Sequence, residues 1–431
     1  MSRIQPTPGT DGADGTGEGG ASRAATGRRK AVRYAVPVAV AGIAAATIGI
    51  GSALASTGDP DLPKISAQDL IARMAASDTQ RLSGSVKITT DLGLPSLPSG
   101  FGLDSGSGGK KDGPAPTPES KLSALTSGTH TLRVAVDGPD KQRLSLVERA
   151  AEYSVIHNGD EVWAYDSASN TAVHSKAPRG KGADSAHKPA GELPRDLAGA
   201  SPQELAKKVV EAADSSTTMT VDGTAKVAGR DAYQLVIKPK QAESTVGSVR
   251  IAVDAKNGVP LKFTLAPKSG GKAVLDAGFT KVDFGRPGAD TFAFTPPKGA
   301  KVTERDAKDA PSADREGKGK GTLPEALGLP GTGGGEPKVT GEGWASIAAF
   351  DAGKDAGGAL AGKGKSAGKG AGKNGDAAAL LDSFGSKVSG DFGSGRVFST
   401  RIVNALMTDD GKVYFGAVSK DALVKAANAA K

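Results

Sequence analysis

The stretch from Gly229 to Gly299 decides how the chain folds: GRDAYQLVIKPKQAESTVGSVRIAVDAKNGVPLKFTLAPKSGGKAVLDAGFTKVDFGRPGADTFAFTPPKG. Apolar and polar residues alternate there in three runs, over 233–238, 249–254 and 261–265. Because successive side chains of a β-strand point to opposite faces, each run predicts a strand with one apolar and one polar face. Lys256–Gly258 predicts a tight turn between two of them, since Asn and Gly tolerate positive φ. Several such strands in a row predict a curved antiparallel sheet.

The composition indicates one domain of ordinary size joined to long flexible segments. The 431 residues include 61 Gly and 25 Pro, and only 4% are aromatic, so much of the chain cannot bury enough apolar surface to offset the entropy of ordering. A formal net charge of +8 is modest for this length, and we therefore expect no nucleic-acid partner. The sequence has no cysteine, which excludes disulfides, thiolate zinc sites and acylation of a lipobox cysteine.

The N-terminal region predicts a disordered cytoplasmic tail over 1–27 and a membrane-directed segment over 28–56. Basic residues precede an uncharged run from Ala35 to Ala55, which is long enough to span a bilayer, since that takes roughly 20 residues. The positive-inside rule puts the residues after this run outside the cytoplasm. The length of the run favours a single-pass transmembrane anchor, whereas the A-x-A pattern that ends at Ala55 fits a signal peptide. We expect either a membrane-anchored protein with an extracellular C-terminal domain or a protein secreted after cleavage near Ala55.

Between residues 66 and 303 the pattern predicts one domain of many strands and two helices. Ser66 caps the first helix, and a capping box at Ser201–Glu204 begins the second. A Gly-, Pro- and Ser-rich stretch over 93–124 predicts a flexible insertion. Ahead of the opening stretch, strands are expected at 82–91, 129–136, 143–148, 152–157, 162–165, 171–174 and 217–227.

The remaining residues predict a linker over 304–337 and a C-terminal extension over 338–431 that packs on the same domain. The linker is rich in Gly, Pro and charge, and the extension contains a Gly/Lys low-complexity tract over 351–376, both typical of flexible chain. Within 396–418, Thr408–Gly411 predicts the turn of a hairpin between strands at 396–407 and 412–418. Further elements expected in the extension are a strand at 344–350 and helices at 377–388 and 420–430.

The expected fold class is α+β, mostly β: an unclosed antiparallel β-barrel, or strongly curved sheet, with helices as a lid. A sheet of so many strands tends to curl, and helices with one apolar face must pack against it. One N-terminal transmembrane or signal helix and several disordered segments complete this prediction.

The sequence predicts no catalytic residues, metal site or cofactor, so we expect a binding protein and not an enzyme. Gly364–Gly368 fits the G-x-S-x-G pattern of serine hydrolases, but a Gly/Lys tract cannot form the strained turn that this chemistry needs. Leu329–Gly333 matches the sortase pattern L-P-x-T-G, and a linker is the better interpretation because no apolar stretch follows. None of the four histidines stands at a short metal-ligand spacing: His130, His157, His174 and His187.

Four motifs resemble those of the LolA-type lipoprotein carriers. PDKQR at Pro139–Arg143 and VIHNGDEVWAYD at Val155–Asp166 resemble the first half of the family, and DAKNGVPL at Asp254–Leu261 and FAFTPPKG at Phe292–Gly299 resemble the second half. Their order and spacing cover 66–302. Mycobacterial lipid-carrying lipoproteins and RseB-type stress sensors share this fold, and the abundance of Gly and Ala resembles that of an actinobacterial protein.

The resemblance implies an unclosed barrel whose lid helices enclose an apolar cavity for acyl chains. Arg143 aligns with the strand arginine of the family and is expected to contact the lid, with a solvated arginine as the alternative. The alternative for every lining residue is plain hydrophobic core. The candidate lining residues are Val86, Ile88, Leu132, Val134, Val236, Val249, Ile251, Leu261 and Phe263.

Two functions follow from the resemblance. The first is an extracytoplasmic protein that binds a lipid or the acyl chain of a lipoprotein and acts as a carrier or chaperone at the cell envelope. The second is an envelope-stress sensor or sigma-factor regulator that works by contact with a signalling protein. The partners expected are therefore a lipid or lipoprotein, the cytoplasmic membrane and a signalling protein.

Overall fold

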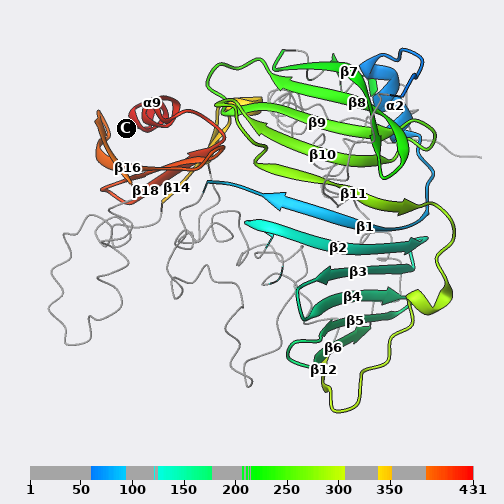
Figure 1. Ribbon diagram of the computed structural model, residues 1–431. Coiled ribbons are helices and arrows are strands. Elements are labelled where there is room, and N and C mark those ends of the chain that lie inside the picture. The colour runs from blue at the N-terminus through cyan, green and yellow to red at the C-terminus, as the bar shows by residue number, and fades with distance from the viewer. Residues whose placement is uncertain are drawn as a thin grey trace, which may run out of the picture.

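The computed structural model describes residues 60–93, 121, 125–176, 206–207, 210–211, 213, 215–305, 338–351 and 385–430. Its main element is a twelve-stranded sheet in the order β12-β6-β5-β4-β3-β2-β1-β11-β10-β9-β8-β7 (Figure 1). The strands are β1 Arg81–Thr90, β2 Gly128–Asp137, β3 Lys141–Val147, β4 Glu152–Asn158, β5 Glu161–Asp166, β6 Thr171–Lys176, β7 Thr217–Val227, β8 Arg230–Pro239, β9 Val246–Asp254, β10 Pro260–Pro267, β11 Leu275–Asp283 and β12 Lys301–Arg305.

The sheet consists of two runs of antiparallel strands that meet in its middle. One run goes from β1 to β6 and the other from β7 to β11, and β1 pairs with β11. The exception to the antiparallel pattern is β12, which pairs with β6 in parallel. The predicted mostly β class is confirmed: the sheet is open, with β12 and β7 as its edges, and the helices with described bounds are α2 (Ala67–Ala75) and α9 (Lys420–Ala429).

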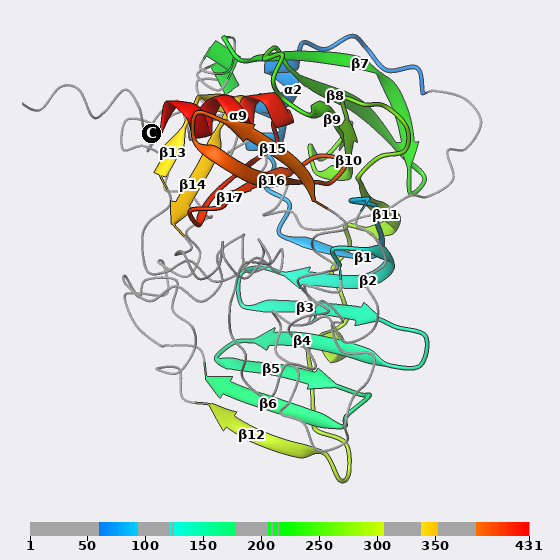
Figure 2. The same cartoon turned by 90° about the vertical axis from the view of Figure 1, so that its left-hand side faces the viewer.

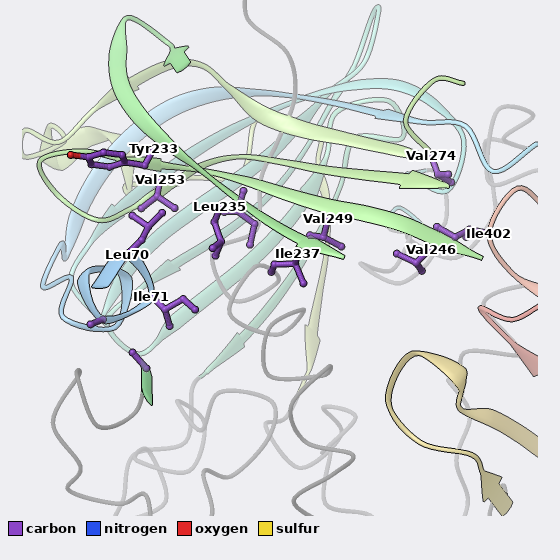
Figure 3. Packing of buried hydrophobic residues seen from close by; sticks show 13 residues of the cluster. Leu70, Ile71, Tyr233, Leu235, Ile237, Val246, Val249, Val253, Val274 and Ile402 are labelled. Carbon is purple, nitrogen blue, oxygen red and sulfur yellow. The ribbon is translucent and has the colours of Figure 1, made fainter. Parts of the chain in front are cut away.

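Helix α2 packs against one face of the sheet, here called the inner face. Ser66 begins the helix as predicted, because its Oγ accepts a hydrogen bond from the Asp69 N–H at 3.0 Å. Leu70 of the helix is fully buried and belongs to one apolar cluster with Leu235 and Val253 of the sheet (Figure 3). Burying one such leucine contributes about 1.5–3 kcal/mol. The described residues of the second predicted helix are helical too, and its Ala206 joins the same cluster.

The opposite, outer face of the sheet is crossed by the segment that follows β11. This segment contains a short 3-10 turn, η1 (Ala289–Thr291), and descends along the sheet to β12 (Figure 1). Phe292 is 1% exposed, and Phe294 contacts the rings of Trp163 and Tyr165, each at a centroid distance of 5.3 Å. The FAFTPPKG motif thus anchors the crossing segment on β5. Residues 304 and 305, predicted to belong to the linker, are part of β12, because the ladder with β6 fixes them.

The C-terminal residues form a second, six-stranded sheet in the order β13-β14-β18-β17-β16-β15, with α9 packed on it. Figure 2 shows this sheet beside the part of the first sheet that contains β8 to β10, away from β4 to β6. The Ala417 carbonyl accepts a hydrogen bond from the Thr245 N–H at 2.9 Å, and Arg401 forms an ion pair with Asp91 at 2.8 Å. The strands are β13 Lys338–Thr340, β14 Ile347–Asp351, β15 Ser386–Gly390, β16 Gly393–Ser399, β17 Asn404–Thr408 and β18 Lys412–Gly416.

Three expectations for the C-terminal extension need correction. The helix predicted at 377–388 is wrong where it is described, since β15 pairs with β16 as an edge strand. The strand predicted over 396–407 is two strands, because Thr400 closes a turn by accepting from the Val403 N–H at 2.8 Å. The strand predicted at 344–350 begins only at Ile347, after a 3-10 turn, η2 (Gly343–Ala345). The hairpin turn at Thr408–Gly411 and the final helix are confirmed.

Several predicted segments lie outside the described residues. They are the tail over 1–27, the membrane-directed segment over 28–56, most of the insertion over 93–124, and nearly all of the two tracts over 304–337 and 351–376. Within the described ranges, no helix combines the length and the hydropathy required to cross a membrane.

Candidate functional site

Five apolar side chains of the inner face form one row across β2 to β6. Val134 lies opposite Leu144, which lies opposite Val155, and the row continues through Ala164 to Val173. All five are partly exposed. With about 4.8 Å between neighbouring strands, the row is about 19 Å long. The described helices pack elsewhere, α2 on β7 and β8 and α9 on the second sheet.

Seven of the nine predicted lining residues lie on the inner face, as the strand register shows. Most of them are buried: Val86 is 0% exposed, and Leu132 and Ile251 are each 2% exposed. In the described part of the chain these three fill hydrophobic core. Val134 and Phe263 are partly exposed, so they are the members of the set that a ligand can reach. That the set lines a cavity stays a prediction.

The other two predicted lining residues, Val236 and Leu261, do not follow the inner-face alternation. Val236 lies opposite Arg250 and Thr220, one residue out of phase with Leu235, so its side chain points to the outer face. The prediction that Val236 shares a face with the other lining residues is therefore wrong. Leu261 lies at a β-bulge between β10 and β9, where the alternation that supported its assignment is interrupted.

Arg143 lies on the outer face and contacts the crossing segment. Its Nη1 donates to the Thr291 carbonyl at 3.2 Å, and its Nη2 lies 3.4 Å from Glu152. The expected lid contact is thus replaced by a contact with the segment before Phe292, because Arg143 alternates with the inner-face Leu144. These groups wall a cavity of about 420 Å³, together with Lys281 and other residues of β1, β2 and β11.

Glu152 is the central acidic group of this outer cavity. Burial raises the pKa of its carboxyl, but hydrogen bonds from Ser154 and Ser145 and the charges of Arg143 and Arg133 outweigh burial and leave the pKa below its usual value. Glu152 therefore stays ionised, and it lies 3.4 Å from each of the two arginines. The lining residues of the outer cavity include three cations and two carboxylates, and more of its wall is apolar than polar.

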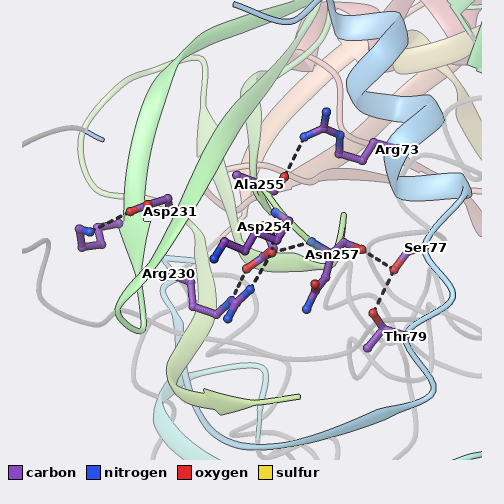
Figure 4. A network of polar contacts seen from close by, with 10 residues as sticks. Arg73, Ser77, Thr79, Arg230, Asp231, Asp254, Ala255 and Asn257 are labelled. Atoms are coloured by element: carbon purple, nitrogen blue, oxygen red, sulfur yellow. Dashed lines mark hydrogen bonds and ion pairs between the residues drawn. The ribbon is translucent and has the colours of Figure 1, made fainter. Parts of the chain in front are cut away.

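The DAKNGVPL motif forms a turn under α2 that a buried carboxylate organises (Figure 4). Asp254 is 0% exposed, and it accepts hydrogen bonds from the Lys256 N–H at 2.9 Å and the Asn257 N–H at 2.7 Å. Arg230 donates two hydrogen bonds to the same carboxylate, from Nε and from Nη2. Burial raises the pKa of Asp254, yet the bonds from Arg230 and the backbone lower it by more, so the net shift is downward.

Two features of this turn require glycine at Gly258: its backbone conformation and its close approach to α2. Its φ is +69°, in the left-handed region that favours glycine, and a Cβ placed there would lie 2.5 Å from the Arg73 carbonyl of α2. Ser77, just after α2, donates to the Asn257 carbonyl at 2.7 Å. The motif therefore docks the end of the helix on the β9–β10 turn.

The inner-face row was not among the predicted site residues, apart from Val134. The short turns predicted after β4 and β5 fix the register of these strands. Register combined with alternation would have placed Leu144, Val155 and Ala164 on the face of Val134. No sequence signal pointed to the partner of Arg143. Among the described residues, no group of three or more His, Asp or Glu side chains is arranged to hold a metal ion.

Comparison with known proteins gives one sequence match and several remote structural ones. No protein-family model matches the chain. It is 36% identical over 72 residues to an outer-membrane lipoprotein carrier protein of Vibrio parahaemolyticus, and the match spans 17% of this chain and 33% of that protein. The MucA/MucB complex of Pseudomonas aeruginosa matches with a TM-score of 0.36 at 13% identity, covering 84% of this chain and 96% of that one. A LolA superfamily protein of Nitrosomonas europaea matches with a TM-score of 0.19 at 11% identity, covering 54% and 99%.

These structural scores are too low to support an argument, and none of the matches tests an actinobacterial source. The sequence match stands by itself, although it covers only a third of the carrier's length. Over that stretch, the chain resembles the LolA-type lipoprotein carriers, as its motifs predicted.

Proposed function

We propose that this protein binds the acyl chain of a lipid or lipoprotein along its inner face and serves, without catalysis, as a carrier or chaperone at the cell envelope. The observation that carries the proposal is the partly exposed apolar row from Val134 to Val173. The sequence match to a lipoprotein carrier supports the same function.

The row suits a long methylene chain in its chemistry and in its length. It presents only Val, Leu and Ala side chains, and it crosses five strands, or about 19 Å. Each methylene group buried there contributes about 0.8 kcal/mol. Partial exposure matters as much as hydrophobicity, because a fully buried row has no room for a ligand.

We further propose that the domain works outside the cytoplasmic membrane, either anchored by the segment over 28–56 or released after cleavage near Ala55. The proposal rests on the charge pattern around that segment. Sequencing the N-terminus of the mature protein separates the two forms, since an anchored chain retains the segment and a released chain begins after it.

The test of lipid binding uses the full chain, purified from cells and extracted with organic solvent for mass spectrometry of bound lipid. We expect stoichiometric lipid in the unaltered protein and about one equivalent less in the double variant Leu144→Gln/Val155→Gln. A matched control, Val302→Gln/Val339→Gln, changes two exposed valines on β12 and β13 and should retain lipid. Circular dichroism shows whether each variant is folded. Lipid-free protein that also fails to take up a fluorescent fatty acid would contradict the proposal.

A second function, regulation by contact with a signalling protein, is favoured by the open edges of the two sheets. Val302 on β12 is 42% exposed and Val339 on β13 is 47% exposed, and both stand on edge strands. Edge strands offer free backbone groups to an added strand. If this function holds, the Val302→Gln/Val339→Gln variant loses a cross-linked partner that the Leu144→Gln/Val155→Gln variant keeps.

A further inference from the structure

A second cavity, of about 460 Å³, lies between the chain just before α2 and the ends of β8 and β9. The N-terminal segment is held over β7 because the Pro60 carbonyl accepts a hydrogen bond from Thr224 Oγ1 at 2.8 Å. The cavity is within the usual size range of small-molecule sites, about 300–1,000 Å³. Its walls include Leu62, Lys64, Ile65, Arg73, Tyr233 and Lys256.

Three cations of this cavity have no carboxylate partner among the residues that the structure describes. Arg73 is half-buried and donates to the Ala255 carbonyl at 2.8 Å, and its guanidinium lies 5.7 Å from the centre of the Tyr233 ring, but it forms no ion pair with a described residue. Lys64 and Lys256 are exposed at the rim and likewise have no ion pair in the described part of the chain.

The other charged groups of the cavity are already matched. Arg230 is paired with Asp254, and Asp231 is paired with Lys226 at 2.8 Å. The unmatched charge around the cavity is therefore positive. The lining of the outer cavity also has one more cation than carboxylates, but there Glu152 lies 3.4 Å from both Arg133 and Arg143.

We propose that this cavity binds the phosphate group of an anionic lipid headgroup. A guanidinium with free donors binds phosphate oxygens in pairs, and lysines add point charges at a distance that suits a mobile headgroup. The wall beside the cations is apolar, since Leu62 and Ile65 pack against the inner-face cluster. A site with a cationic rim and an apolar wall fits an amphiphile better than it fits a fully hydrated anion.

The position of the cavity suits a membrane surface. Pro60 lies four residues beyond the end of the segment over 28–56, so at most about 14 Å of chain separates it from a bilayer that this segment spans. Basic side chains that reach an anionic lipid surface are attracted to it by about 1 kcal/mol each. The inference goes beyond the proposed function, because headgroup binding here neither requires nor follows from acyl-chain binding on the row of β2 to β6.

The test measures binding of phosphatidylglycerol to the full chain in a neutral detergent by native mass spectrometry. Two further ligands show which part of the lipid is bound. Diacylglycerol with the same acyl chains lacks the phosphate, and inorganic phosphate lacks the acyl chains. The variant Lys64→Gln/Lys256→Gln removes two exposed charges, and Lys420→Gln/Lys425→Gln removes two exposed charges on α9 as a matched control.

We expect the Lys64→Gln/Lys256→Gln variant to bind phosphatidylglycerol at least about tenfold more weakly, with diacylglycerol binding unchanged and the control unaffected. Competition by millimolar inorganic phosphate would identify free phosphate as the ligand and overturn the headgroup assignment. Equal affinity of the unaltered protein for phosphatidylglycerol and diacylglycerol would also overturn it, while leaving acyl-chain binding in place. The Leu144→Gln/Val155→Gln variant provides an independent check. If this variant no longer binds diacylglycerol but still binds phosphatidylglycerol, the result supports the headgroup site.

Discussion

The two halves of the twelve-stranded sheet are covered on opposite faces. In the half from β7 to β10, α2 packs on the inner face, where Leu235 and Ile251 are buried. In the half from β4 to β6, the crossing segment packs on the outer face, where Phe294 contacts Trp163 and Tyr165. The same alternating pattern along the strands therefore leads to different surroundings.

The difference shows why one apolar face contains both core and candidate site. The inner face of the first half is filled by helix side chains. In the second half, the covering segment lies on the other side, and the row from Val134 to Val173 stays partly exposed. Four sets of substitutions break or sharpen this comparison.

The largest effect is expected at the anchor of the crossing segment. Phe292→Ala should lower the free energy of unfolding by about 3–5 kcal/mol, because the ring is 1% exposed and its removal leaves a cavity. Urea denaturation of the purified protein measures the change, and Phe292→Leu, which keeps most of the volume, should cost less than about 1.5 kcal/mol. A loss below about 1 kcal/mol for Phe292→Ala would mean that the segment does not hold the outer face.

The next effect compares the two halves of the inner face directly. Leu235→Ala should cost about 3 kcal/mol, since Leu235 is 2% exposed. Leu144→Ala should cost about 1 kcal/mol, because Leu144 is already partly exposed. Thermal or urea unfolding reports both values. Equal losses would contradict the distinction between a filled and an open half.

The third effect concerns the contact between α2 and the β9–β10 turn. Gly258→Ala should cost about 2–3 kcal/mol, because it adds a Cβ 2.5 Å from the Arg73 carbonyl at a φ of +69°. Gly159→Ala is a matched control with a φ of +63° and no atom within 4 Å, so only the backbone cost of about 1 kcal/mol applies. If both variants unfold at the same urea concentration, the helix does not press on the turn.

The smallest effect is a change in pH dependence at Asp254. Because its pKa is lower in the folded than in the unfolded state, the unfolded chain binds more protons as the pH falls through about 4. Asp254 therefore stabilises the fold above that range and ceases to do so as the pH drops through its folded pKa. Asp254→Asn should flatten the acid limb of a stability–pH curve. If the slope of stability against pH is unchanged in this variant, other carboxylates cause the loss of stability at low pH.

Local patterns in the sequence predicted the elements, and non-local contacts decided what they touch. Alternation around Leu235 and Ile251 identifies strands because period two is a property of one strand. The parallel pairing of β12 with β6 could not be predicted, since Lys301–Arg305 has no alternating apolar pattern and the ladder joins residues far apart in the chain. Arg143 shows the same limit: its strand was predicted, but its contact with Thr291 depends on the path of the crossing segment.

The candidate site could be predicted in part. The inner-face members of the lining set follow from alternation, whereas Val236 is one residue out of phase with Leu235 and lies on the other face. Which of these residues stay exposed could not be predicted, because exposure depends on where α2 and the crossing segment pack. In the sequence, Asp254 stands out only as the first residue of the DAKNGVPL motif. The structure shows what it does: its carboxylate accepts hydrogen bonds from Arg230 and from the backbone of the turn.

The central claim is that the inner face of β2 to β6 holds an acyl chain. The most direct measurement is photo-crosslinking of the full chain with a fatty acid that carries a diazirine along its chain, followed by peptide mapping. We predict labels on Val134, Leu144 and Val155, and their loss when unlabelled lipid competes. Labels confined to outer-face positions such as Arg143 or Ser154, or labelling that unlabelled lipid does not reduce, would contradict the claim.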